Sequence, residues 1–198
     1  MYLVLPRRAE SAREELLADA ARAVLGAAEE FGHRDEWRQW APRPRKVCVR
    51  GRPAEVDRVR ALDHVAVGEV LCLPPRRRSE REPELVRLQA HSGGPLEAGD
   101  PAPAHPDRAL FLLRSDLGMT FGKAVAQIGH AALALGEAGP LEVRLADADT
   151  FARADRELDP PCVRDAGLTE VAPGTVTALA LPPGPRPEWL LRAVRAVG

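Results

Sequence analysis

Short apolar runs alternate with helical patterns along the whole chain. Residues 2–5 and 109–113 are apolar runs, and each precedes a segment with apolar residues at helical spacing. Within these runs apolar and polar residues do not alternate, which is typical of strands that helices cover on both faces. The pattern therefore predicts a layered α/β fold, a three-layer sandwich around a small mixed sheet.

The two flanks of the chain repeat the same order of elements. In each flank the first run and its helix precede a second apolar run, a short charged helix and a third apolar run that ends in two prolines. The second runs are 46–50 and 141–145, the charged helices are 54–62 and 147–158, and the third runs are 67–75 and 173–185. We interpret this order as two tandem copies of one β-α-β-α-β unit that form a pseudo-dimer. Ordinary alternation in an α/β protein would also produce it.

A boundary is predicted between the two flanks. Residues 78–107 are dense in proline, glycine and charge, and a short helix is expected within 82–90, with Leu85 and Leu88 on one side. From His91 onward the composition indicates a flexible linker. The predicted domains are 1–77, a degenerate copy, and 108–198, with 78–107 as the linker.

Helix ends are predicted from capping residues. Ser11 with Glu14 forms a capping box, and Gly32 fits the position after the last helical turn. A last helix is expected to open at Pro187 and to carry Leu190, Val194 and Val197 on one face.

Composition limits the classes of function. The chain has 198 residues, of which 45% are apolar and 29% charged, so it can bury a core. The net charge of −1 provides no global field toward nucleic acid, so such binding needs a local basic patch. No apolar run is long enough for a membrane span, and the first residues do not resemble a signal peptide, so a membrane partner is not expected.

The cysteines and histidines do not predict a metal or a cofactor. Cys48, Cys72 and Cys162 are far apart, with no C-x-x-C motif, which argues against a disulfide framework or a cysteine zinc site. The five histidines are scattered without metal-ligand spacing. A reducing cytoplasm is the expected location.

The most informative segment is 115–134. At helical spacing, Lys123, Gln127 and His130 share one face, opposite the apolar residues. A solvated polar face would give the same spacing. However, the glycine-rich turn 118–122 is expected to leave backbone N–H groups free at a helix N-terminus, where anions bind. Lys123 then lies where the helix dipole disfavours a cation, and only it and Lys46 are lysines among 28 basic residues.

A second candidate segment is 165–174. Asp165 and Thr169 lie four residues apart around Gly167, in a loop-like stretch before the last apolar run. Taken alone, Asp-Ala-Gly is also ordinary turn chemistry.

Together the two segments resemble the type 2 peptidyl-tRNA hydrolases. The first reads Asp116-Leu117-Gly118-Met119-Thr120-Phe121-Gly122-Lys123, followed by Ala126-Gln127-Ile128-Gly129-His130-Ala131. The second reads Asp165-Ala166-Gly167-Leu168-Thr169-Glu170-Val171-Ala172-Pro173-Gly174. The resemblance spans about 108–198, and it is specific because two separated motifs occur in the family's order.

The resemblance implies a three-layer α/β domain with a mixed four-stranded sheet, commonly dimeric. It implies hydrolysis of the ester between a peptide and the terminal ribose of tRNA, with no metal. It places the catalytic residues at Lys123, Asp165 and Thr169, with Gln127, His130 and Gly122 as supporting or substrate-binding residues.

The roles of these residues remain open at the level of sequence. Lys123 would stabilise an oxyanion or a phosphate, Asp165 would orient it or accept a proton, and Thr169 would position water or attack the ester itself. His130 lies two turns along the helix, which favours a structural hydrogen bond over a role as base.

The sequence also departs from the family pattern. Leu168 and Glu170 stand where the family usually has arginine and glutamine, which weakens the attraction for a polyanion. The alternatives to peptidyl-tRNA hydrolysis are therefore a non-catalytic binding module of the same fold and a hydrolase of another small ester.

The first flank lacks these motifs. Residues 7–11 replace the Gly-Lys segment, so we expect a degenerate copy without a site, packed on the second copy as a built-in pseudo-subunit. A local basic cluster would contact an RNA backbone or merely solvate a strand end; it comprises Arg43, Arg45, Lys46, Arg50 and Arg52.

Overall fold

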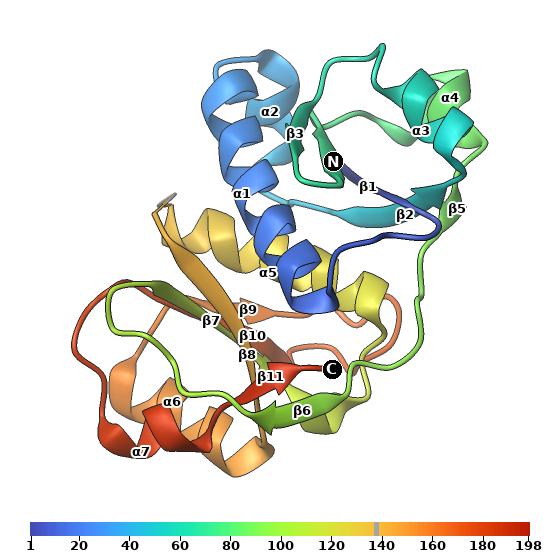
Figure 1. The fold of residues 1–198 in the computed structure, drawn as a ribbon. Coiled ribbons are helices and arrows are strands. Elements are labelled where there is room, and N and C mark those ends of the chain that lie inside the picture. Colours follow the sequence, from blue (N-terminus) through green and yellow to red (C-terminus); the bar gives the residue numbers. More distant parts are fainter. Residues whose placement is uncertain (137–138) are drawn as a thin grey trace.

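The computed structural model describes residues 1–136 and 139–198. Two mixed β-sheets lie on either side of a pair of helices, α1 (Arg13–Phe31) and α5 (Phe121–Leu135) (Figure 1). The outer face of each sheet is covered by further helices. The predicted layered α/β class is confirmed, and each half of the chain is a helix-sheet-helix sandwich.

The first sheet is built from the N-terminal half and the segment that follows it. Its order is β3-β4-β1-β2-β5, with β1 parallel to β2 and the other neighbours antiparallel. The strands are β1 (Tyr2–Pro6), β2 (Val47–Gly51), β3 (Val65–Val67), β4 (Val70–Leu73) and β5 (Gln89–Ala90).

The second sheet is built from the C-terminal half, and its order is β6-β11-β8-β7-β10-β9. Here β7 is parallel to β8, and the other neighbours are antiparallel. The strands are β6 (Ala98–Pro101), β7 (Ala109–Arg114), β8 (Leu141–Ala146), β9 (Cys162–Arg164), β10 (Val176–Leu181) and β11 (Arg195–Val197).

The remaining helices are short and lie mainly on the outer faces of the two sheets. They are α2 (Asp35–Trp40), α3 (Pro53–Val59), α4 (Pro83–Val86), α6 (Ala148–Leu158) and α7 (Glu188–Ala193), with 3₁₀ turns η1 (Arg78–Glu80) and η2 (Ser115–Leu117). None of the helices in the described part of the chain is long and apolar enough to cross a membrane.

One hydrophobic core runs through both halves. Leu3 of β1 and Phe111 of β7 belong to the same cluster of buried residues as Leu17 of α1 and Ile128 of α5. Burial on this scale is the main favourable term in folding. The pairing of α1 with α5 therefore makes the two halves one packed body.

The two sheets share a topology. The strand order β3-β4-β1-β2 has the same connections and directions as β9-β10-β7-β8. Glu69, between β3 and β4, accepts hydrogen bonds from the backbone just before α1, as Glu170, between β9 and β10, does just before α5. A tandem duplication as the origin of this likeness stays a prediction.

The interpretation of 78–107 as a flexible linker is wrong in detail. The expected short helix is α4, and Leu85 is buried against the outer face of the first sheet. Beyond His91 the chain stays attached, because Leu96 is buried in the shared core and β6 pairs with β11. Backbone pairing and apolar contacts on both sides fix the segment despite its glycines and prolines.

Two predicted helix ends are also wrong. Ala12 is the residue before α1, Ser11 makes no side-chain cap, and Gly32 keeps right-handed φ and ψ. The last helix stops at Ala193, because Val194 turns extended and residues 195–197 pair with β6 and β8. A strand partner thus overrides the helical spacing at the C-terminus.

Candidate active site

Helix α5 positions the polar residues that the sequence singled out. Its first turn is capped by Thr120, whose hydroxyl accepts a hydrogen bond from the backbone of Lys123. Gly118 and Gly136 adopt left-handed conformations at the two ends, which glycine tolerates without strain. The local signals therefore fix where the helix begins and where Lys123 lies.

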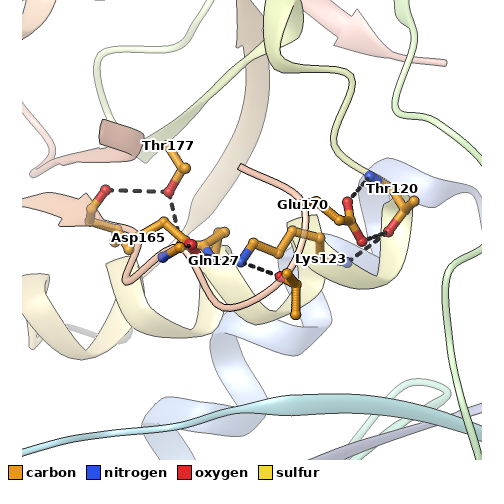
Figure 2. A network of polar contacts seen from close by, with 9 residues as sticks. Thr120, Lys123, Gln127, Asp165, Glu170 and Thr177 are labelled. Carbon is orange, nitrogen blue, oxygen red and sulfur yellow. Dashed lines mark hydrogen bonds and ion pairs between the residues drawn. The ribbon is translucent and has the colours of Figure 1, made fainter. Parts of the chain in front are cut away.

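Lys123 and Asp165 meet beside α5 (Figure 2), and Thr169 also contacts Lys123. The Lys123 ammonium forms an ion pair with Oδ2 of Asp165 and donates to Thr169 Oγ1 at 3.0 Å. The side chains of Lys123 and Asp165 are only 11% and 7% exposed, whereas Thr169 lies at the surface. The ammonium thus lies just below the surface, in contact with the exposed Thr169.

Asp165 follows β9, and its carboxylate is held from three directions. Oδ2 accepts from Lys123 and, at 2.8 Å, from Gln127 Nε2, while Oδ1 accepts from the Gly167 backbone at 2.8 Å. Burial opposes ionisation, but these hydrogen bonds and the positive charge of Lys123 set the pKa of Asp165 below its ordinary value. Asp165 is therefore a carboxylate at neutral pH, and a weak base.

Gln127 is itself fixed by a buried partner. Thr177, the second residue of β10, is fully buried and donates its hydroxyl proton to Gln127 Oε1 at 2.8 Å (Figure 2). Thr177 thus selects the orientation in which the Gln127 amide group points at Asp165. Through these two hydrogen bonds, β10 helps to fix the position of the Asp165 carboxylate.

The predicted anion site at the start of α5 is closed. The backbone N–H groups of Phe121 and Gly122 donate to Gly94 O and Ser92 O, each at 2.9 Å. Thr120 N donates to Glu170 at 2.7 Å. The segment before β6 has taken the place of an anion, because an unpaired N–H buried there would be costly.

Gly122 is needed for this contact. A Cβ on Gly122 would lie 1.6 Å from the carbonyl oxygen of His91, so only glycine allows the segment to approach the helix. Gly122 therefore supports the fold beside the site and does not face it.

Glu170 is turned away from the ammonium of Lys123. Its carboxylate accepts from both the backbone and the hydroxyl of Thr120, each at 2.7 Å (Figure 2). A negative charge at a helix N-terminus is stabilised by the helix dipole. Glu170 thus serves as a second cap on α5.

His130 lies apart from the Lys123 cluster and contacts the N-terminal half. Its Nδ1 lies 3.1 Å from Nζ of Lys46, which is 9% exposed and lies against the Trp40 ring. Burial, followed by the charges of Lys46 and Lys123, lowers the pKa of His130 to about 3. His130 is therefore neutral at pH 7, and Nδ1 accepts a hydrogen bond from Lys46, as expected for a structural residue.

Lys46 is consequently no part of an exposed basic patch. The proposed cluster with Arg43 and Arg45 loses this member to the interface between the halves, because the lysine stem packs on Gly129 of α5. Lys46 thus packs on α5, and Lys123, which belongs to α5, contacts the loop that contains Asp165 and Thr169.

No family model matches the chain. A comparison with curated proteins does find a relative. The chain is similar to a peptidyl-tRNA hydrolase. That protein, from Thermococcus sibiricus (strain DSM 12597 / MM 739), is 29% identical over an alignment of 100 residues, which covers 39% of this chain and 85% of the relative. This similarity supports a hydrolase at the level of the family.

Sequence reasoning missed two residues of the network, Thr120 and Thr177, and the contact that Glu170 makes. Thr120 carried a signal, because threonine before a helix is a preferred cap. Thr177 is a lone hydroxyl in an apolar strand, which indicates a buried hydrogen bond. The partner of Glu170 could not be found from the sequence, because Thr120 lies fifty residues away.

Proposed function

We propose that this protein hydrolyses the ester bond between a peptide and the terminal ribose of tRNA. The observation that carries the proposal is the contact of the Lys123 ammonium with both Asp165 and the surface hydroxyl of Thr169. The similarity to a peptidyl-tRNA hydrolase and the two sequence motifs support the choice of substrate.

Lys123 supplies the positive charge in this reaction. When water adds to the ester carbonyl carbon, the carbonyl oxygen becomes negative, and an ammonium beside it lowers the barrier. Asp165 orients the ammonium, and its own lowered pKa makes it a poor proton acceptor. Gln127 and Thr177 are positioning residues for Asp165.

Thr169 positions the water or the substrate. Its oxygen accepts from Lys123, so its hydroxyl proton is directed toward an incoming group. Within the described residues, no carboxylate or imidazole is hydrogen-bonded to this hydroxyl, which disfavours Thr169 as the nucleophile. The water oxygen bonds to the carbonyl carbon, the bond to the ribose oxygen breaks, and a proton from water passes to that oxygen.

The test is peptide release from a model peptidyl-tRNA by the full chain. We expect Lys123→Ala and Asp165→Ala to lower kcat at least about 100-fold, the usual cost of losing an oxyanion-stabilising group. Asp165→Asn keeps the shape but not the charge, and is expected to lose most of the activity. The control is Arg156→Gln, at a guanidinium that is 71% exposed on α6.

Two results would overturn the proposal. The first is unchanged turnover in both alanine variants, with thermal unfolding showing that they fold. The second is a wild-type chain that binds tRNA in a salt-dependent way but releases no peptide, which would indicate a binding module instead.

A further inference from the structure

A cavity of about 550 Å³ is lined mainly by the N-terminal half, together with residues 91–94 and Phe121 of α5, and Lys123 is not among its lining residues. It opens at the carboxyl ends of the parallel strands β1 and β2, beside the start of α1. Ligands of open α/β sheets bind at such ends, where the strand order reverses direction. The cavity lies at these carboxyl ends, next to the only parallel pair of strands in the first sheet as the structure describes it.

Four basic side chains line the cavity, and none of its described lining residues is acidic. They come from separate elements: Arg7 follows β1, Arg13 begins α1, Arg50 lies in β2 and His91 follows β5. Strand pairing brings them together, since Arg50 is opposite Leu5 on one side and Gln89 on the other. The three guanidinium groups concentrate positive charge here, which indicates an anionic ligand.

Two donor or acceptor atoms in this cluster are buried without a partner. Within the described chain, neither Nε of Arg50 nor Nδ1 of His91 has a hydrogen-bond partner. An unsatisfied buried polar atom costs about 1–3 kcal/mol and calls for an explanation. Burial, followed by the charges of the nearby guanidinium groups of Arg50 and Arg13, also lowers the pKa of His91.

The rest of the wall is pre-formed. Arg13 donates to the carbonyl oxygens of Gly93 and Pro95, at 2.8 and 3.0 Å, and its guanidinium lies 5.5 Å from the centre of the Phe121 ring. Gly93 and Gly94 both have positive φ, which lets the backbone bend closely around the cavity. The chain between β5 and β6 that forms this wall is the green segment that passes the start of α5 in Figure 1.

We propose that this cavity binds a phosphate group. Guanidinium forks match phosphate oxygens in geometry and charge, and a neutral histidine adds one more donor. The cavity stands at the connection from β1 to α1, which corresponds to the connection from β7 to α5 where the Lys123 site lies. The N-terminal half would thus keep a binding site at the corresponding place, with phosphate as its ligand.

The first experiment is calorimetric titration of the full chain with inorganic phosphate, against chloride at matched ionic strength. We expect binding that also raises the unfolding temperature. Arg50→Gln should weaken the affinity at least about tenfold, the effect of losing one charge-assisted contact of roughly 1.4 kcal/mol or more. Arg156→Gln, far from the cavity, should not change it.

The Lys123→Met variant tests whether phosphate binds in the cavity or at the Lys123 site. If phosphate occupies the cavity, this variant binds it as the wild type does. The proposal is overturned if phosphate does not bind, if Arg50→Gln binds it unchanged, or if Lys123→Met loses it instead. Peptide release is not a readout here, so this result is independent of the proposed activity.

A salt titration with tRNA then distinguishes the source of the phosphate. If the ligand is a nucleic-acid backbone, Arg50→Gln lowers tRNA affinity and reduces the slope of log affinity against log salt by about one. If the ligand is a free nucleotide or another small phosphate compound, tRNA affinity stays unchanged while phosphate binding is lost. Either result supports the phosphate site.

Discussion

Nζ of Lys46 lies 3.1 Å from Nδ1 of His130 and joins the N-terminal half to the helix that carries Lys123. Both side chains are largely buried, and burial lowers the pKa of Lys46 to about 7. The contact is therefore a polar link inside an apolar interface, and its protonation depends on pH near neutrality.

Lys46→Met should make the protein more stable at pH 7. The unfolded lysine titrates near 10.4, so between about pH 10 and pH 7 the unfolded chain binds a proton that the folded chain does not. In the wild type this contribution lowers stability as the pH falls to about 7, and it is constant below that value. We expect the variant to gain about 1–3 kcal/mol at pH 7, reduced by the lost bond to His130.

The measurement is urea unfolding of both proteins between pH 7 and pH 8.5. The α-amino group, whose pKa burial lowers to about 5, gives the wild type a slope of the same sign up to about pH 8. Both proteins have this α-amino group, so its contribution drops out when the two free energies of unfolding are subtracted. If the difference in the free energy of unfolding stays constant across this pH range, Lys46 is not the source of the pH dependence.

Thr177→Val should disturb the site from a distance. The substitution keeps the shape but leaves Gln127 Oε1 buried without its 2.8 Å partner, which costs about 1–3 kcal/mol of stability. Because Gln127 then no longer points firmly at Asp165, we expect kcat to fall with little change in KM. Thr177→Ser restores the hydroxyl and should restore kcat; equal kcat in all three proteins would refute a positioning role.

Glu170→Gln should strengthen tRNA binding. It removes a negative charge beside the site while an amide oxygen can still accept from Thr120. We expect a lower KM for peptidyl-tRNA at low salt, an effect that disappears at high salt, and a loss of about 0.3–1 kcal/mol in stability from the helix dipole. Glu157→Gln on α6 is the matched control, and a KM equally lowered there would show a general charge effect.

Gly122→Ala should destabilise the whole protein. Its Cβ would overlap the His91 backbone, so the segment before β6 must move away from α5 and leave N–H groups unpaired. We expect a loss of about 2–4 kcal/mol, measured by thermal or urea unfolding. Gly139→Ala is the control, because its Cβ would meet no atom of the described residues within 4 Å; similar losses at both positions would contradict this account.

Residues 105–198 expressed alone should not form a stable monomer. The α5 surface that packs on α1 and β2 would be exposed, and Arg144 would lose its partner Glu14. We expect aggregation or self-association, measured by light scattering, and recovery when residues 1–104 are supplied separately. A soluble, stable monomer would argue against the N-terminal half as a built-in pseudo-subunit.

Local patterns in the sequence determined much of the fold. The apolar runs predicted β1, β7, β8 and β10, and helical spacing placed Lys123 and Gln127 on one face of α5. The two motifs also singled out Asp165 and Thr169, which meet Lys123 in the structure. The strands and the helix face depend on neighbours within a few residues, which spacing describes, whereas the resemblance to a family connected the two motifs.

Only the tertiary structure decided which surfaces meet. It closed the predicted anion site with Ser92 and Gly94, turned residues 195–197 from helix to strand, and buried Lys46 against His130. Each outcome depends on a partner far away along the chain, whose burial or hydrogen bonding outweighs local preference. The sequence thus determined the elements and the candidate residues, while long-range packing decided which polar groups stay free to bind a ligand.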